Sequence, residues 1–277
     1  MAKGIGLIGN FRGKVGNMVG YNLKDSNNKQ TQGVRVYQPV VKNPKTYGQA
    51  EQRAKLAPIN ATYRALKAII DRGQEGKAYG NKSRLAWLSD AMKAFDRCWF
   101  EKGSDITEPP FVNVTKGTLG SPFALPNLAE QVAITFPNAL TSAPTTIGAL
   151  STALLSGFPF LKEGDQITFV EMGGGDGPIS AIFDSIVINS TSTESLPSSI
   201  SATTEMVKIT QTVNNLIAGC IILSREGDSG QHLRSTTALT ACVDYESRHS
   251  SNAAKEAAIK SYMSAGANTD WAEESLQ

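Results

Sequence analysis

The chain changes its hydrophobic period near Gly103, and this change restricts the folds that it can adopt. Before Gly103, apolar side chains recur at alternating steps of three and four residues, which places them on one face of a helix. The two runs that do so are Leu56, Ile59, Tyr63, Leu66 and Ile70, and then Leu85, Leu88, Met92, Phe95 and Trp99. After Gly103, short apolar runs are separated by turn residues, a pattern typical of antiparallel β-structure. The sequence therefore predicts an α+β protein.

The helical part is expected to form a hairpin within residues 43–103. Thr46 is placed to cap the first helix, which would end near Gly73. Pro58 lies inside this helix and would either kink it or start a new one. A second helix is expected over residues 82–99, and pairing of the two helices would bury both apolar stripes.

Residues 104–250 are expected to form an antiparallel β-sandwich or a small barrel. The strand-like runs are residues 131–136, 166–172, 183–189, 206–212, 216–225 and 235–243. The last part, residues 251–277, contains an alanine-rich segment at 252–265 that predicts a short helix. Trp271 in the tail is expected to dock on a surface, because an exposed tryptophan is costly.

Residues 1–42 are expected to form a glycine-rich basic arm that contains one edge strand. Glycines recur at short intervals through the first 33 residues, and each glycine costs about 1 kcal/mol in a helix interior. Residues 33–41 alternate like a strand, which Pro39 would terminate or confine to a sheet edge. We therefore predict an irregular arm that orders against a partner or against the rest of the chain.

The near-neutral net charge of +2 conceals two oppositely charged parts. Residues 1–103 hold 19 Lys and Arg against 7 Asp and Glu, whereas residues 104–277 hold 8 against 18. The basic part could contact an acidic protein surface, neutralise the phosphates of a nucleic acid, or simply be solvated. Protein contact is favoured, because an acidic part lies in the same chain. The candidate contact residues are Arg12, Lys14, Lys42, Lys45, Gln49, Gln52, Arg53 and Lys55.

The most enzyme-like motif is Gly227-Asp228-Ser229-Gly230, which resembles the nucleophile segment of chymotrypsin-like serine proteases. That chemistry needs a histidine base beside the serine, and in that family the histidine comes earlier in the chain. Here His232 and His249 both follow the serine, and Gln231 replaces the family's second glycine. A hairpin turn is the better interpretation, and a serine hydrolase is a remote alternative.

No other segment suggests a cofactor, a metal or a reaction. Three cysteines, Cys98, Cys220 and Cys242, have no CxxC spacing, so neither a disulfide framework nor a zinc site is expected. Cys220 is expected to be a buried, inert thiol. Residues 9–14 resemble a phosphate-binding loop, but they have too few residues between the glycines, and Val15 replaces the Ser or Thr that binds magnesium. We expect no catalytic residue, no metal and no cofactor.

Neither export by a signal peptide nor a membrane span is expected. The first residues lack the uninterrupted apolar stretch that a signal peptide contains. The longest apolar run, residues 216–223, falls far short of the roughly 20 residues that cross a bilayer. Together with the cysteine pattern, this predicts a reducing compartment, such as a cytoplasm or a particle assembled in one.

Three segments stand out by their motifs and their order. They are Gly13-Lys14-Val15-Gly16-Asn17-Met18-Val19-Gly20, then Asn43-Pro44-Lys45-Thr46 with residues 49–55, then residues 112–120. Together they resemble an uncharacterised family found in Bacteroidetes genomes and in gut phages or related mobile elements. The resemblance covers about residues 6–120, and Tyr47 stands where the family usually has proline. It implies a phage or mobile-element product of a non-enzymatic kind, and no activity can be carried over.

The sequence therefore predicts a structural or assembly protein, associated with a phage virion or present in the host cytoplasm. The basic arm and the helices would contact other subunits of the same assembly, and a homo-oligomer is expected. The alternative is a protein that binds nucleic acid through its basic part.

Overall fold

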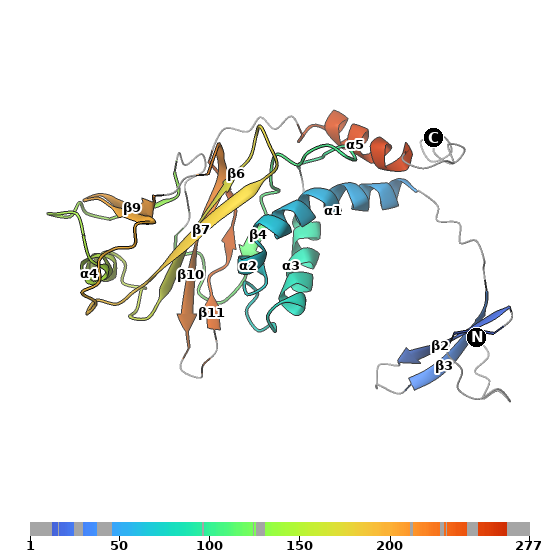
Figure 1. The fold of residues 1–277 in the computed structure, drawn as a ribbon, viewed down its shortest axis with the longest axis horizontal. Helices are drawn as coiled ribbons and strands as arrows, with labels where there is room; N and C mark the ends of the chain where they lie inside the picture. The colour runs from blue at the N-terminus through green and yellow to red at the C-terminus, as the bar shows by residue number, and fades with distance from the viewer. Residues whose placement is uncertain are drawn as a thin grey trace. The chain divides into compact units, whose positions relative to one another are not determined.

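Figure 1 shows the fold of the chain as a computed structural model. It describes residues 13–15, 17–24, 30–37, 46–95, 97–123, 125, 131–210, 213–227, 230, 232–242 and 249–264. The chain divides into two compact units, Met1–Pro44 and Lys45–Gln277. The expected boundaries near residues 103 and 250 therefore lie inside the second unit. Helices and antiparallel sheets are both present, so the predicted α+β class is confirmed.

The N-terminal unit contains a small antiparallel sheet of three strands. They are β1 (Gly13–Val15), β2 (Met18–Lys24) and β3 (Gln30–Val36), in the order β1-β2-β3. The expectation of an irregular arm is therefore wrong for these residues. Glycines disfavour a helix, but they are compatible with this sheet. Tyr21 lies opposite Gly33 and covers it so closely that a Cβ added at Gly33 would come within 2.7 Å of the Tyr21 ring.

The first helical segment begins where the sequence predicts it. Helix α1 (Tyr47–Ala65) is capped by Thr46, whose hydroxyl accepts a hydrogen bond of 3.4 Å from the Gln49 amide. Pro58 lies inside α1 without ending it. A turn at Leu66 separates α1 from the short helix α2 (Lys67–Ile70).

The second helix, α3 (Asn81–Ala94), is shorter than predicted, and its buried face includes Leu88 and Met92 of the predicted stripe but not Leu85. Leu85 is 55% exposed, whereas Ser83 and Trp87 are buried. Two polar contacts anchor this face. The Ser83 hydroxyl donates to the Ile70 carbonyl at 2.6 Å, and the Trp87 indole donates to the Asn113 carbonyl at 2.8 Å. The apolar period alone could not reveal these contacts, which extend the buried face to Ser83 and Trp87 and leave Leu85 outside it.

The main sheet of the second unit has five antiparallel strands. They are β6 (Gln166–Gly173), β7 (Ser180–Val187), β10 (Leu216–Glu226), β11 (His232–Arg234) and β13 (Thr240–Ala241). The order is β11-β10-β6-β7, with β13 paired to β10, so β7 forms one edge. The sheets formed by the described strands do not close into a barrel.

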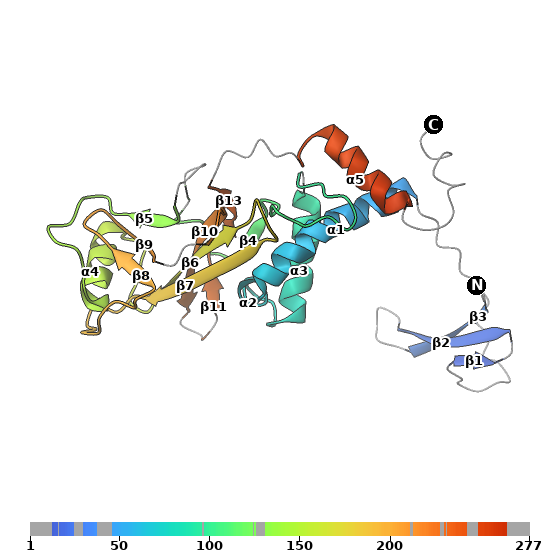
Figure 2. The same ribbon diagram turned by 45° about the horizontal axis from the view of Figure 1, so that its top comes forward.

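Smaller elements complete this unit (Figure 2). Strands β5 (Ala133–Thr135), β8 (Ile200–Ala202) and β9 (Met206–Ile209) form one sheet, and β4 (Asn113–Thr115) pairs with β12 (Thr237–Ala238). Two further helices are α4 (Ile147–Gly157) and α5 (Asn252–Ser264). The C-terminal helix was predicted, whereas α4 was not.

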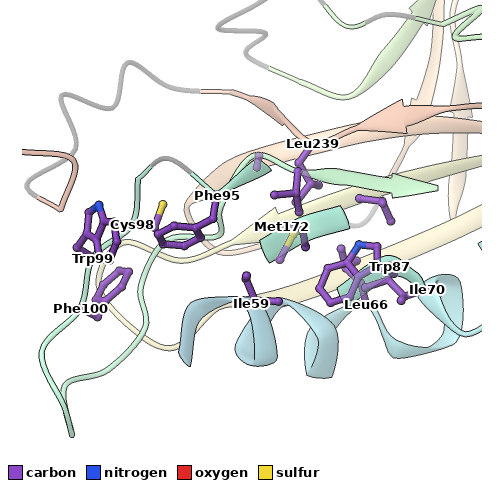
Figure 3. Packing of buried hydrophobic residues seen from close by; sticks show 14 of the residues in the cluster. Ile59, Leu66, Ile70, Trp87, Phe95, Cys98, Trp99, Phe100, Met172 and Leu239 are labelled. Atoms are coloured by element: carbon purple, nitrogen blue, oxygen red, sulfur yellow. The ribbon is translucent and has the colours of Figure 1, made fainter. Parts of the chain in front are cut away.

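Apolar side chains pack into two clusters on opposite faces of the main sheet. One cluster joins the sheet to α1, α3 and α5 (Figure 3), and the other joins it to α4 and the small β5-β9-β8 sheet. Along β10, Ile222 belongs to the first cluster and its neighbour Ile221 to the second. This strand is buried on both faces, which explains its nearly continuous apolar sequence.

Candidate functional site

The N-terminal sheet presents one apolar face. Its register sets Met18 opposite Val36 and Gly20 opposite Val34, so their side chains share a face. Met18 is 40% exposed, Val34 51% and Val36 72%. No described helix or second sheet within this unit covers them. Burial of this face against another surface would be favourable, because removing apolar area from water is favourable.

The basic candidates of the N-terminal unit are only partly placed. The ammonium group of Lys14 lies 3.6 Å from the centre of the Tyr37 ring, a cation–π contact. Arg35 on β3 is exposed. Arg12, Lys42 and Lys45 lie outside the described residues. Among the described residues, the structure therefore brings the basic candidate Lys14 together with the aromatic ring of Tyr37.

The remaining predicted contact residues lie on the first turns of α1. Gln49 and Gln52 are exposed, and Arg53 is half-buried. Residues three and four apart are neighbours on a helix surface, so Gln49 lies beside both Gln52 and Arg53. These three side chains form a small polar patch on α1.

Lys55 instead belongs to an internal contact between α1 and α5. Its ammonium group lies 3.1 Å from Glu51, and Lys255 of α5 lies 3.4 Å from the same carboxylate. Both lysines also lie over the Trp99 ring, at 5.8 and 5.2 Å from its centre. Partial burial raises the pKa of Glu51, but the hydrogen bonds and charges of Lys55 and Lys255 outweigh this effect and hold the pKa below its usual value.

A pocket of about 440 Å³ lies between the end of α2 and the main sheet. Three neighbouring strands form the floor of the pocket, because Thr168 of β6 is paired with Ile222 of β10 on one side and with Ser185 of β7 on the other. Towards the helices the same sheet face is apolar and buried. The pocket therefore begins where the helical layer ends. Its walls include Arg72, Arg234, Asp71, Thr115, Gln166, Phe183 and Ser224.

Two arginines give this pocket its charge. Arg234 is half-buried and donates to the Leu233 carbonyl at 3.2 Å, and at 3.5 Å to the carbonyl of Arg72. Burial and the nearby charge of Arg72 lower the pKa of Arg234, although Glu75 opposes the shift. Within the described part of the chain, neither guanidinium forms an ion pair with a carboxylate.

The nearby carboxylates are engaged elsewhere. Glu75 accepts hydrogen bonds from the backbone amides of Arg234 and Thr118, both at 2.9 Å, and from the Thr118 hydroxyl. Asp71 accepts from the Tyr63 hydroxyl at 2.9 Å and faces Lys67 at 3.7 Å. The pocket therefore carries two positive charges that these acids do not pair with directly.

The hydrolase residues are not assembled into a site by the described structure. Asp228, Ser229 and Gln231 lie outside the described residues. His232 is exposed on β11 near Tyr79, and the His249 ring stacks on Phe100 with centres 4.1 Å apart. In the described ranges, no group of three or more His, Cys, Asp or Glu residues is arranged to hold a metal ion.

The three cysteines are buried. Burial, with a smaller effect from Cys242, raises the pKa of the Cys220 thiol to about 12. Burial likewise raises the pKa of Cys242, to about 11, with a smaller effect from Glu171. Such thiols remain protonated at neutral pH and are poor nucleophiles. The prediction of a buried Cys220 is confirmed.

Sequence reasoning missed the pair of Arg72 and Arg234. They are 162 positions apart, and no motif or spacing links them.

In the comparisons with known proteins, no family model, curated protein or solved structure matches the chain. The candidate sites therefore rest on geometry: the apolar face of the N-terminal sheet, the polar patch on α1 and the arginine pocket.

Proposed function

We propose that the chain is a non-enzymatic structural or assembly protein, associated with a phage virion or present in the host cytoplasm. One observation supports this most strongly. The N-terminal sheet is a separate unit with Met18, Val34 and Val36 exposed on one face. An isolated sheet of this size needs another surface to cover its apolar face. A second copy of the chain is the partner we propose.

Charge supports contact between copies. Arg35 is exposed on the same sheet, and the first 103 residues carry a large excess of basic side chains. Residues 104–277 carry 18 acidic against 8 basic residues. The basic unit of one copy would therefore be attracted to the acidic part of another, and the apolar face would supply burial at the contact.

The oligomeric state of the full chain tests this proposal. We expect light scattering after size exclusion to give a mass above 29.5 kDa, rising with concentration. The double variant Val34→Asp/Val36→Asp should shift the protein towards monomer, because it places negative charges on the proposed contact face, where the acidic part of another copy would repel them. Val187→Asp is the matched control, since Val187 is also 51% exposed but lies on β7 in the other unit.

A wild-type chain that is monomeric at every concentration would contradict the proposal. So would an oligomer that survives the double variant unchanged.

None of the helices in the described ranges is both long enough and apolar enough to cross a membrane. The phage context rests on the resemblance of three segments to a family of mobile elements, and neighbouring capsid or portal genes would test it.

Nucleic-acid binding is the second candidate, supported by exposed Arg35 and by Lys14 with Tyr37 on the same small sheet. A protein that neutralises several phosphates loses affinity steeply as salt rises. Binding to mixed-sequence DNA should then weaken by at least about tenfold between 50 and 200 mM salt. Absence of salt-dependent binding would remove this candidate.

A further inference from the structure

The pocket between α2 and the main sheet has the features of a ligand site. Its volume of about 440 Å³ falls within the range of roughly 300–1,000 Å³ that is usual for small-molecule pockets. It combines two guanidinium groups with hydroxyls and an aromatic side chain. This combination is independent of the N-terminal sheet and of its proposed role in assembly.

The two arginines determine the charge of a suitable ligand. A guanidinium presents several N–H donors in a planar fork that matches a carboxylate or a phosphate. The carboxylates of Glu75 and Asp71 accept hydrogen bonds from other groups and form no ion pair with the guanidinium group of Arg72 or Arg234, although the charge of Glu75 acts on Arg234. The Arg72 guanidinium lies 5.8 Å from the centre of the Tyr79 ring. A bound anion would therefore supply the direct ionic partner that the two guanidinium groups lack.

The rest of the pocket determines the shape of the ligand. Phe183 is 43% exposed and, with Ile222, provides an apolar surface at the sheet. Thr168 and Ser224 add hydroxyl groups to the floor, while the Ser185 hydroxyl accepts a hydrogen bond from Gln166 at 2.8 Å. These groups suit a molecule with one apolar or flat end and one polar, charged end.

We propose that this pocket binds a small organic anion, with its carboxylate or phosphate at Arg72 and Arg234 and its apolar end against Phe183. Three probes test the proposal on the full chain by calorimetric titration. They are phenyl phosphate, benzoate and the neutral benzamide. We expect one or both anions to bind and benzamide to bind at least about tenfold more weakly, because a charge-assisted hydrogen bond contributes enough for that difference.

Substitutions locate the binding in the pocket. Arg72→Met and Arg234→Met should each weaken anion binding by at least about tenfold. Arg64→Met is the matched control, because Arg64 is exposed on α1 and does not line the pocket. If Arg234→Met unfolds the half-buried site, the anion affinity of the Arg72→Met variant decides the test alone, because Arg72 is exposed.

Three results would overturn the proposal. The first is that neither anion binds at about 10 mM, where even a millimolar Kd would give saturation. The second is that benzamide binds as tightly as the anions. The third is that Arg72→Met leaves the affinity unchanged. Light scattering on the same samples keeps this test separate from the assembly proposal, because loss of anion binding should leave the mass unchanged.

Discussion

Two buried carboxylates, one on β6 and one just before it, differ in whether their oxygens have hydrogen-bond partners. Asp165 is fully buried, and its two oxygens accept hydrogen bonds of 2.7 Å from Nε and Nη2 of Arg225. Glu171 is 2% exposed, and its Oε2 has no hydrogen-bond partner. A paired buried charge becomes costly when its partner is removed, whereas an unpaired one is costly already. The two residues therefore give opposite predictions.

Replacing Asp165 with asparagine should destabilise the second unit. The substitution leaves Arg225, whose side chain is only 18% exposed, without its counter-charge. Breaking such a pair costs about 3 kcal/mol or more in the free energy of unfolding. Urea denaturation measures the change, with Glu194→Gln as an exposed control. A loss for Asp165→Asn no larger than that of the control would contradict the prediction.

Replacing Glu171 with glutamine should stabilise the protein at neutral pH. Burial raises the pKa of Glu171, although a backbone hydrogen bond from Val213 and the charge of Lys208 oppose the shift. A raised carboxyl pKa means that the folded state disfavours the ionised form, so stability falls as pH rises above the unfolded value. Glutamine removes that penalty without changing the size of the side chain.

We expect Glu171→Gln to raise Tm at pH 7 by roughly 2–4 °C, equivalent to about 1 kcal/mol in a unit of this size. The difference should shrink as the pH falls towards 4, where wild-type Glu171 is protonated in both states. Thermal unfolding followed by circular dichroism at several pH values measures both effects. An equal or lower Tm at pH 7 would count against an ionised, unpaired Glu171.

Sequence reasoning at the residue scale succeeds where the cause is local. Cys220 lies in an apolar run, so its burial could be predicted, and Thr46 precedes a helical pattern, so its capping role could be predicted. Arg72 and Arg234 meet only because α2 and β11 border the same sheet face. No local property of the sequence encodes that meeting.

At the scale of elements, α5 is held to α1 by apolar packing and by a small charge cluster. Ala258 and Ile259 are fully buried in the cluster of the helical face. Glu51 lies between Lys55 and Lys255, and both lysines lie over Trp99. Figure 1 shows α5 lying beside α1. The carboxylate of Glu51 therefore connects the two helices directly.

Replacing Glu51 with glutamine should loosen the docking of α5. A pair at the surface contributes about 0.2–1 kcal/mol, so amide hydrogen exchange over residues 252–264 should accelerate up to about fivefold. Because the pKa of Glu51 is lowered, this contribution is present at neutral pH and is lost as the pH falls through the lowered pKa. Glu256→Gln, exposed on α5, is the control. Equal exchange in the two variants would contradict the prediction.

The elements differ in how far the sequence specifies them. Strand β10 is a long apolar run, and both its existence and its bounds could be predicted. Helix α4 is rich in Ser, Thr, Gly and Ala, which resembles loop composition, and its buried face combines Leu150 and Leu154 with Gly148 and Ser151. The face of α3 is set by Ser83 and Trp87 through hydrogen bonds to other segments. Tertiary contacts thus decide what local periodicity leaves open.

At the scale of the molecule, the division at Pro44 predicts that the second unit folds by itself. A chain truncated to residues 45–277 should keep its Tm within about 2 °C of the full chain, because both apolar clusters of the second unit consist of residues within this range. Differential scanning calorimetry of both chains measures this. The oligomers proposed for the full chain should be absent from the truncated one. A fall in Tm of more than about 5 °C would show that residues 1–44 stabilise the second unit.

Strand β10 couples the two apolar clusters of the second unit. Its neighbouring residues Ile221 and Ile222 point into opposite clusters, so a shift by one position would move each into the wrong one. Loss of the helical side would uncover one face of the strand and remove support from the other. The helical side and the α4 side should therefore melt in a single cooperative transition, although they look like separate layers. A proteolytic fragment containing only one side would retain no native fold.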